Sequence, residues 1–339
     1  MQPHRPGPFL MLAIVTLLTS CAPVIYPMGP AVTASAIEIM GANAILIALD
    51  GVRLPIQSWQ PDGKPKAVFL ALHGFNDYAN GVALPAAHWT AQGIATWAYD
   101  QRGFGRAPHR GYWAGTAAMI ADLRTAAALL KRRHPDVPLY LLGVSMGGAV
   151  AMAALAQGRV TGVDGAILVG PAVWGRAHMP FYQRAALWFF SNIIPWFPLT
   201  GEGLNRQPSD NIPMLRALGR DPLIIRETRI DTIKGLVDLM DAAYDGAARI
   251  DHTPVLMIYG LRDEIVPKAP VLHAMRSLPR RAGTKRALYD AGWHMMLRDL
   301  KAEIVWRDIA GWIADRTAAL PSGADKKAAA FLTKTKDQK

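Results

Sequence analysis

The sequence predicts an α/β fold in which a mostly parallel central sheet is flanked by helices and carries one inserted helical cap. The first observation is a hairpin pattern, with strands expected at residues 44–49 and 53–59 around the turn residues Asp50-Gly51. The second is a repeated alternation of short buried-strand runs with helical stretches. The third is an insertion at residues 176–250, roughly 75 residues between two core strands, which is far longer than an ordinary connection.

The elements after the hairpin alternate between strands and helices. We expect strands at residues 67–72, 94–99, 139–142, 166–169, 255–259 and 286–289. Helical stretches separate most of these strands, at residues 116–133, 147–156, 267–277 and 303–317. Repeated βα units pair their strands in parallel and place helices on both faces of the sheet. The insertion has no convincing strand, and we expect it to cap the carboxyl edge of the sheet.

The composition indicates a globular protein with a basic surface. Of the 339 residues, 51% are apolar, so the chain can bury a large core and global disorder is excluded. Lys and Arg number 37 against 26 Asp and Glu, which gives a net charge of +11. Such a charge suits anionic surfaces, including nucleic acid and phospholipid headgroups. No nucleic-acid-binding module is visible, so we expect no nucleic acid partner. Proximity to a membrane and general solubility remain as the two explanations of the positive net charge.

The first twenty residues have the pattern of a secretory signal peptide. Residues 1–8 carry Arg5 and no acidic residue, and residues 9–18 are almost wholly apolar. This run is too short to cross a hydrocarbon core of about 30 Å as a helix. Leu18-Thr19-Ser20 precedes Cys21, the only cysteine of the chain. The string resembles the lipobox of bacterial lipoproteins, in which the cysteine becomes the lipidated first residue.

That resemblance implies a lipoprotein signal peptide at residues 1–20, a lipid anchor on Cys21 and a place in the bacterial cell envelope. Ala22 follows the cysteine rather than Asp, which by the same resemblance favours the outer membrane. An ordinary signal peptide and an incidental buried cysteine are the alternatives. With a single cysteine the chain has no intrachain disulfide, so its stability must come from packing.

Two terminal segments are expected outside the folded domain. Residues 21–40 are small and Pro-bearing without periodicity, which predicts a tether; its fifteen residues after the cysteine would reach at most about 50 Å. The domain is expected at residues 41–320. Residues 321–339 contain Pro321, Gly323 and five lysines, which is typical of a solvated basic tail.

Ser145 has the sequence context of a catalytic nucleophile. The string Gly143-Val144-Ser145-Met146-Gly147 follows the predicted strand 139–142 and begins a helix. A sharp strand-to-helix turn places the serine hydroxyl at the edge of the sheet, and the two glycines leave room where a Cβ would clash. The G-x-S-x-G string alone is a weak signal, and its position between strand and helix makes it a strong one. A serine that merely caps the helix is the alternative.

An oxyanion formed by this serine needs two preorganised donors. One is expected to be the backbone N–H of Met146, the residue after the nucleophile. The other is the N–H of Phe75, in the loop His73-Gly74-Phe75 that follows strand 67–72. We expect His73 to orient this loop rather than act as the base, because it precedes the nucleophile.

The acid and the base are expected after later strands, in the chain order Ser, Asp, His. Asp263 follows strand 255–259, where a carboxylate can orient an imidazole, and the adjacent Glu264 is the alternative acid. His294 lies in the loop directly after strand 286–289. It is the one histidine in a post-strand loop after Asp263, and this position predicts it as the base.

No metal or cofactor is expected. The chain has no HExxH, CxxC or phosphate-binding motif, and the adjacent pair Asp263-Glu264 lacks a metal-ligand spacing. The Gly-rich string Asp100-Gln101-Arg102-Gly103-Phe104-Gly105 follows a strand. We expect it to brace the loops beneath the active site.

Together these residues resemble the monoacylglycerol lipase and lysophospholipase group of α/β-hydrolases, also described as serine aminopeptidase-like. The resemblance covers residues 41–317. It rests on Asp50-Gly51 with Trp59 and Pro61, His73-Gly74-Phe75, residues 100–105, residues 143–148, Asp221-Pro222-Leu223, residues 260–267 and Gly292-Trp293-His294. It implies the α/β-hydrolase fold and a serine hydrolase. The family often has His where Gln101 stands, and commonly Glu or Asp where Met295 stands, which leaves subfamily and substrate open.

The resemblance implies hydrolysis of a carboxylic ester, with monoacylglycerol or lysophospholipid as substrate. We expect Phe181, Trp188 and Trp196, at the start of the cap, to supply an apolar acyl-binding pocket, and a purely structural packing of these aromatics on the sheet is the alternative. A small-peptide aminopeptidase is a second hypothesis, in which Asp241 and Asp245 would hold the substrate amine. A short-chain carboxylesterase and a non-catalytic envelope binding protein are the others. The sequence does not specify the acyl chain length of the substrate, its headgroup or the oligomeric state of the protein.

Overall fold

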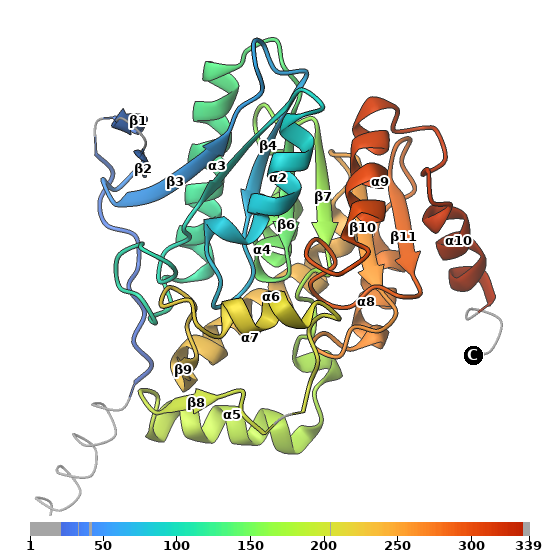
Figure 1. The fold of residues 1–339 in the computed structure, drawn as a ribbon. Coiled ribbons are helices and arrows are strands. Elements are labelled where there is room, and N and C mark those ends of the chain that lie inside the picture. Colours follow the sequence, from blue (N-terminus) through green and yellow to red (C-terminus); the bar gives the residue numbers. More distant parts are fainter. Residues whose placement is uncertain (1–21, 33, 41–42, 204, 335–339) are drawn as a thin grey trace, which may run out of the picture.

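The computed structural model describes residues 22–32, 34–40, 43–203 and 205–334. Within these residues the main sheet has nine strands in the order β1-β2-β3-β5-β4-β6-β7-β10-β11 (Figure 1). The strands are β1 (Ala36–Met40), β2 (Asn43–Ile47), β3 (Arg53–Trp59), β4 (Ala67–Leu72), β5 (Ile94–Tyr99), β6 (Leu139–Val144), β7 (Gly165–Val169), β10 (Val255–Gly260) and β11 (Lys285–Tyr289). Pairing is antiparallel from β1 to β5 through β2 and β3, and parallel among the other strands. The predicted hairpin and mostly parallel sheet are confirmed.

Helices cover both faces of the sheet. They are η1 (Ala79–Val82), α2 (Ala83–Thr90), α3 (Thr116–Arg133), α4 (Met146–Ala156), η2 (Arg176–His178), α5 (Phe181–Ile193), α6 (Ile212–Leu218), α7 (Ile230–Gly246), η3 (Ala247–Arg249), α8 (Lys268–Ser277), α9 (Ala302–Ala314) and α10 (Ala324–Lys334). Residues of α3, α4, α7 and α8 join one buried cluster, and residues of α2 and α9 join a second. No described helix is both long enough and apolar enough to cross a membrane.

Strand β4 shows how the two clusters are separated. Val68 and Leu70 belong to the cluster under α3 and α4, whereas Phe69 and Ala71 belong to the cluster under α2 and α9. Successive side chains of a strand point to opposite faces, so a strand covered on both sides is a continuous apolar run. This is why the bounds of β4 were predicted correctly. Helix α2 was not predicted, because its eight residues include Pro85 and show no clear helical period.

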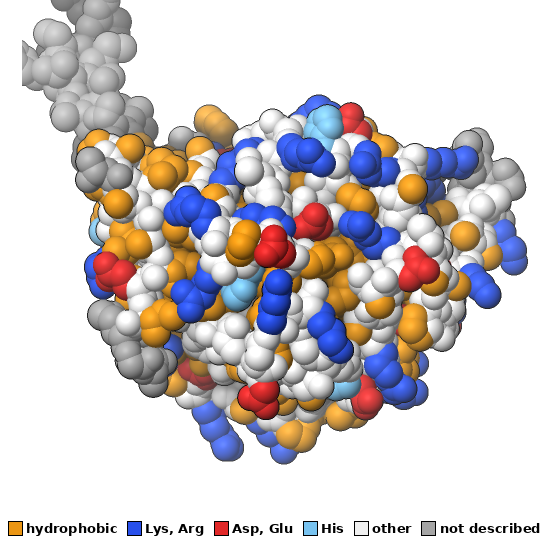
Figure 2. All heavy atoms as spheres, turned by 90° about the horizontal axis from the view of Figure 1, so that it is seen from above, with side chains coloured by type: hydrophobic (Ala, Val, Ile, Leu, Met, Phe, Trp, Pro, Cys, Tyr) orange, Lys and Arg blue, Asp and Glu red, His pale blue; other side chains and the backbone are white. Residues whose placement is uncertain are grey.

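The parallel strands point toward the inserted segment, so their amino ends lie at the opposite end of the molecule (Figure 1). Figure 2 looks onto that opposite end and shows Lys and Arg side chains interspersed with Asp and Glu. The surface at the amino ends of the parallel strands therefore carries charged side chains of both signs.

The prediction of a free tether at residues 21–40 is wrong for the described part of that segment. The Tyr26 N–H donates to the Trp113 carbonyl at 3.0 Å, and the Val32 N–H donates to the Leu49 carbonyl at 2.6 Å. Strand β1 pairs with β2 along its whole length. A Pro-bearing segment without periodicity gave no local sign of these contacts, because its backbone groups pair with loops that are distant in sequence.

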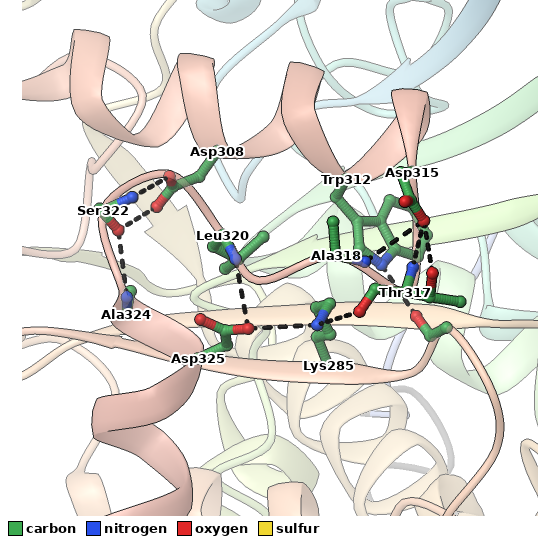
Figure 3. A network of polar contacts seen from close by, with 11 residues as sticks. Lys285, Asp308, Trp312, Asp315, Thr317, Ala318, Leu320, Ser322, Ala324 and Asp325 are labelled. Carbon is green, nitrogen blue, oxygen red and sulfur yellow. Dashed lines mark hydrogen bonds and ion pairs between the residues drawn. The ribbon is translucent and has the colours of Figure 1, made fainter.

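The prediction of a solvated tail at residues 321–339 is also wrong where the structure describes it. Figure 3 shows the polar network that holds this segment: Asp308 of α9 accepts hydrogen bonds from the N–H and hydroxyl of Ser322, and Lys285 of β11 pairs with Asp325 at 3.1 Å. Helix α10 then packs along β11. Its buried side chains are Ala324 and Ala328. Two small residues among lysines are too weak a pattern to reveal a docked helix.

The insertion at residues 176–250 divides into two layers. The outer part, residues 176–229, contains α5 and α6 and two short strands, β8 (Pro198–Thr200) and β9 (Glu227–Arg229), which pair antiparallel. The expectation of no strand is therefore wrong, since three-residue strands leave no recognisable pattern. The inner part, α7, packs against α4, and a Cβ at Gly235 would stand 2.3 Å from the Trp113 ring. We call residues 176–229 the outer cap.

Candidate active site

Ser145 stands on the sharp turn between β6 and α4. Its backbone angles are φ 50° and ψ −113°, a conformation that costs a non-glycine residue about 1–3 kcal/mol. A Cβ at Gly147 would lie 2.2 Å from the Leu72 carbonyl oxygen, and a Cβ at Gly143 would lie 2.6 Å from the Gly147 oxygen. Both positions therefore require glycine, as the sequence predicted, and the turn presents Ser145 at the carboxyl edge of the sheet.

The structure brings the three predicted catalytic residues together. His294 Nε2 lies 3.0 Å from Ser145 Oγ, and His294 Nδ1 lies 2.8 Å from Asp263 Oδ2. The other carboxylate oxygen of Asp263 accepts the N–H groups of Ile265 and Val266, at 2.8 and 2.9 Å. Ser145 and His294 are only 9% and 8% exposed. An imidazole aligned between a carboxylate and a hydroxyl can take the hydroxyl proton.

Glu264, the alternative acid, is directed elsewhere. Its side chain is exposed, and its Oε2 accepts the Gln207 N–H at 2.8 Å. Asp263 and Glu264 are neighbours, so the turn after β10 directs only one of them at the imidazole. That one is Asp263.

The two predicted oxyanion donors flank the nucleophile. Met146 is the first residue of α4, where a backbone N–H has no acceptor within the helix. Phe75 lies in the loop after β4, and this loop passes close to the serine: a Cβ at Gly74 would be 3.5 Å from Ser145 Cβ. The Gly147 N–H, in α4, donates to the carbonyl of His73 at 3.1 Å. This bond joins the loop after β4 to the start of α4.

His73 supports this loop and is not available as a base. Its Nε2 accepts the Gln101 N–H at 2.9 Å, and its Nδ1 lies 2.8 Å from the Gly74 carbonyl oxygen. Because Nε2 accepts an N–H and Nδ1 faces a carbonyl oxygen, this geometry requires a proton on Nδ1 and none on Nε2, and burial lowers the pKa of His73. The Gln101 amide returns a bond to the His73 carbonyl, and Asp100 accepts two further backbone N–H groups at 2.8 and 2.9 Å. The predicted bracing role of residues 100–105 is confirmed.

Asp299 is a site residue that the sequence did not single out. It accepts the Trp293 N–H at 2.9 Å and the Ser209 hydroxyl at 2.6 Å, and burial raises the pKa of its carboxyl. The Met295 N–H donates to the Pro208 carbonyl at 2.9 Å beside it. The loop that carries the base is thus bound to the outer cap on both sides of His294. In the sequence Asp299 stands beside Arg298 and belongs to no recognisable motif.

A second link joins the oxyanion loop to its surroundings. Asp77, two residues after Phe75, pairs with Arg298 of the His294 loop. The Tyr78 hydroxyl donates to Asp221 of the outer cap at 2.8 Å, and burial raises the pKa of Tyr78 to about 12. Acid, base and oxyanion loops and the outer cap therefore form one connected polar frame.

The aromatic residues predicted to bind an acyl chain do not line an enclosed pocket. Phe181, Trp188 and Trp196 are 81%, 69% and 50% exposed. Helix α5 contacts the rest of the protein along a stripe that includes Leu187 and Ser191. The acyl-pocket prediction and the alternative of buried packing are both wrong for these residues, because aromatic content does not distinguish a pocket, a core and an exposed apolar surface.

Of the two acidic residues considered for amine binding, Asp241 is engaged within the protein, whereas the side chain of Asp245 is exposed on α7. Asp241 accepts the Arg176 N–H at 2.6 Å and also pairs with the Arg176 guanidinium. That guanidinium binds Asp238 as well, at 2.7 Å. Among the described residues, no group of three or more His, Cys, Asp and Glu side chains could hold a metal ion.

A strained serine between a parallel strand and a helix, followed in chain order by its acid and base, occurs in serine hydrolases of the α/β-hydrolase fold. This chain is one of them. It belongs to the family described as Serine aminopeptidase, S33 (Hydrolase_4), whose model matches residues 63–301. The matched range contains the turn at Ser145, the outer cap, Asp263 and His294.

Several proteins similar to this chain are lipases. The chain is 26% identical over 272 residues to the monoacylglycerol lipase of Mycolicibacterium smegmatis. The aligned region covers 78% of this chain and 93% of that protein. It is 24% identical over 288 residues to the monoglyceride lipase of Mus musculus, covering 82% and 92%. A soluble variant of the monoglyceride lipase from Saccharomyces cerevisiae, solved with a substrate analog, superposes with a TM-score of 0.68 at 19% identity, covering 87% of this chain and 100% of that one. This last likeness shows the fold.

Proposed function

We propose that the protein is a serine ester hydrolase of monoacyl lipids, with monoacylglycerol as the first candidate substrate and lysophospholipid as the second. The observation that carries the proposal is the hydrogen-bonded chain from Asp263 through His294 to Ser145. The similarity to monoacylglycerol lipases over almost their whole length supports the substrate class. The exposed aromatic residues of the outer cap support it too, since large exposed apolar surfaces mark contact with another apolar phase.

In the proposed reaction Ser145 attacks the ester carbonyl while His294 takes its hydroxyl proton. Asp263 holds the imidazole and stabilises its positive charge. The N–H groups of Met146 and Phe75 bind the oxyanion, each contributing about 3 kcal/mol to lowering the barrier. His294 gives its proton to the departing glycerol oxygen, which leaves an acyl group on Ser145. Water activated by His294 then releases the fatty acid.

The alternatives have less support. An aminopeptidase needs free carboxylates to bind the substrate ammonium group, and Asp241 is occupied by Arg176. A non-catalytic binding protein has no need of three aligned catalytic groups. A short-chain carboxylesterase would use the same reaction, so it is tested by substrate preference.

The substrate proposal is tested with a series of p-nitrophenyl esters from acetyl to palmitoyl, beside a monoacylglycerol and a lysophospholipid. Ser145→Ala protein serves as the control for contaminating esterase activity. We expect kcat/KM to rise with acyl length and to be highest on monoacylglycerol. A preference for acetyl esters would instead identify a short-chain carboxylesterase.

We further propose that the mature protein begins at a lipidated Cys21 in the bacterial cell envelope, with the outer membrane favoured. Residues 1–21 lie outside the described residues, so the sequence pattern alone supports this proposal. Cys21→Ser should abolish metabolic labelling with palmitate and move the protein from the membrane fraction to a soluble or uncleaved pool. Identical fractionation of both forms, with no label in either, would contradict it.

A further inference from the structure

The described N-terminal segment, residues 22–32, is bound to the domain at several points, and we call it the strap. The Val24 N–H donates to Asp231 Oδ2 at 3.2 Å, and the Gly29 N–H donates to Asp50 Oδ2 at 3.0 Å. Together with the bonds of Tyr26 and Val32 to main-chain carbonyls, these contacts spread along the whole strap. The strap is therefore bound to the domain, whereas a tether over residues 21–40 would have no such contacts.

Tyr26 fixes the first part of the strap. Its ring stacks on His109, with centroids 3.9 Å apart and planes at 11°, and meets the Tyr112 ring edge-on at 5.1 Å. The Arg229 guanidinium lies 4.3 Å from the Tyr112 centroid and forms two hydrogen bonds with Asp231, at 2.6 and 2.9 Å. Asp231, which also binds Val24, is almost fully buried. The beginning of the strap is therefore fixed at the junction of β9 and α7.

The junction of β9 and α7 lies beside residues 195–197, which follow α5 in the chain. The Ile230 N–H donates to the Phe197 carbonyl at 3.1 Å, and the Asp231 N–H donates to the Pro195 carbonyl at 3.0 Å. Figure 1 shows the start of the described chain next to β8 and β9. Two residues, Ala22 and Pro23, separate Val24 from Cys21, and the three Cα–Cα steps between them span at most about 11 Å. Whatever anchors the chain at its N-terminus is consequently held close to the outer cap.

The outer cap is apolar on the side that α5 forms. Nine large hydrophobic residues between positions 181 and 199 are each 40% exposed or more. They are Phe181, Tyr182, Trp188, Phe189, Phe190, Ile193, Trp196, Phe197 and Leu199, and we call them the aromatic cap face. Helix α5 carries Arg184 and no acidic residue. Trp, Phe and Tyr beside a cation and without acids suit the interface of a phospholipid bilayer.

We infer that the strap holds the N-terminal anchor and the aromatic cap face on one side of the molecule, so that the cap lies in the same bilayer that carries the anchor. The inference rests on the proposed anchoring at Cys21. Its occupant for the aromatic cap face is the phospholipid bilayer, because Val24, three positions after the proposed lipid anchor, is bound beside this face, and the face combines exposed aromatic residues with Arg184 and no acidic residue on α5. The outer cap covers the carboxyl edge that carries Ser145, so the site would receive its substrate from that bilayer.

The test separates the anchor from the strap. Lipidated protein is reconstituted into vesicles of phosphatidylethanolamine and phosphatidylglycerol that contain monoacylglycerol. In the variant, a Gly/Ser linker of about 20 residues between Ala22 and Pro23 adds roughly 25 Å of root-mean-square length and leaves every strap contact in place. The control carries the same linker after Lys334.

We expect the variant to hydrolyse vesicle-borne monoacylglycerol about three- to tenfold more slowly, because a longer linker lowers the effective concentration of the cap at the bilayer. Hydrolysis of a dissolved butyryl ester should be unchanged, which reports on the proposed reaction separately. Quenching of Trp188 and Trp196 by brominated phospholipid should fall as well, measured against protein carrying Trp188→Phe and Trp196→Phe. The control should behave as wild type.

If the variant floats with the vesicles and keeps wild-type quenching and vesicle activity, the strap inference is overturned and the anchor proposal stands. If wild-type protein fails to float with the vesicles, both are overturned.

Discussion

The two ends of the central sheet differ in what they expose to solvent. At the amino ends of the parallel strands, loops 60–66, 131–138, 157–164, 249–254 and 278–284 contain no exposed large hydrophobic residue. Figure 2 shows Lys, Arg, Asp and Glu side chains at this end with apolar atoms between them. At the carboxyl ends, the outer cap exposes the nine residues of the aromatic cap face. The catalytic residues and the aromatic cap face therefore both lie at the carboxyl end of the parallel strands. The loops named above, at the amino end, expose no large hydrophobic residue.

This difference changes what the basic composition means. The net charge of +11 suggested proximity to a membrane or general solubility. Exposed cations such as Lys64, Arg132 and Arg281 lie at the amino end, away from the outer cap. Solubility explains those cations, and the apolar cap gives better grounds for expecting lipid contact than the charge does.

The largest effect should come from the centre of the carboxyl end. Ser145→Ala should lower kcat by a factor of about 10⁴ or more and abolish labelling by a fluorophosphonate probe, because no other group can form the acyl-enzyme. Thermal unfolding should change little, since a hydroxyl at a loop edge contributes little packing. Persistent labelling of the variant would mean that another serine is the nucleophile.

The next effect tests which carboxylate at this end matters. Asp263→Asn should lower kcat by about 10⁴, because the amide favours the wrong tautomer of His294. Glu264→Gln should be nearly silent, because the exposed Glu264 carboxylate accepts the Gln207 N–H and does not face His294. Steady-state kinetics of the two variants with one ester compares them directly. The reverse ranking would assign the role of the acid to Glu264.

A smaller effect is expected from the contact between the base loop and the outer cap. Asp299→Asn should lower kcat roughly ten- to hundredfold with little change in KM, since small displacements of His294 are costly. The matched control is Asp210→Asn, because half-buried Asp210 accepts the Leu300 N–H at 2.9 Å in the same region. Equal kinetics of the two variants would show that Asp299 does not position the base.

The comparison of the two ends is sharpened by paired surface variants. Trp188→Ser with Trp196→Ser should weaken partitioning into phospholipid vesicles about three- to tenfold, since apolar area is lost from the cap. Lys64→Ser with Arg132→Ser at the amino end should change partitioning much less. Flotation of each protein with vesicles, alongside its activity on a dissolved ester, provides the measurement. Equal losses in both pairs would contradict a lipid-facing cap.

The smallest effect on catalysis is expected at a buried ion pair at the side of the sheet, whose removal acts on stability. The guanidinium of Arg102, bonded at 2.7 Å, lowers the pKa of Asp50 from 3.8 to about 2. Because this pKa is lower in the folded protein, ionised Asp50 stabilises the fold above pH 3.8, and that contribution is lost as the pH falls toward 2. Asp50→Asn should therefore unfold less steeply with acid in that window, as measured by urea unfolding. An unchanged slope would contradict the assignment.

The sequence identified the elements and site residues that leave local patterns. Strands buried on both faces are continuous apolar runs, which is why β4 and β5 were predicted at their observed bounds. The glycines around Ser145 are required by backbone contacts within one turn, so the motif and its position between strand and helix were sufficient to indicate the nucleophile. Asp263 and His294 followed from their positions after later strands.

The remaining features depended on contacts between distant parts of the chain. Tyr26 stacks on His109, Asp299 bonds to Ser209 of the outer cap, and α10 packs along β11. None of these pairings leaves a periodic signal in either partner.

The sequence by itself therefore determined the α/β fold, the nucleophile, the acid and the base, because each is encoded within a few adjacent residues. Only the tertiary structure decided that the aromatic residues of α5 face solvent and that the N-terminal segment is bound beside them. The physical reason is that burial is a property of packing: a Trp has the same preference for an apolar phase in a core, a pocket or a membrane interface. Which of these surrounds it is settled by the elements that fold against its helix.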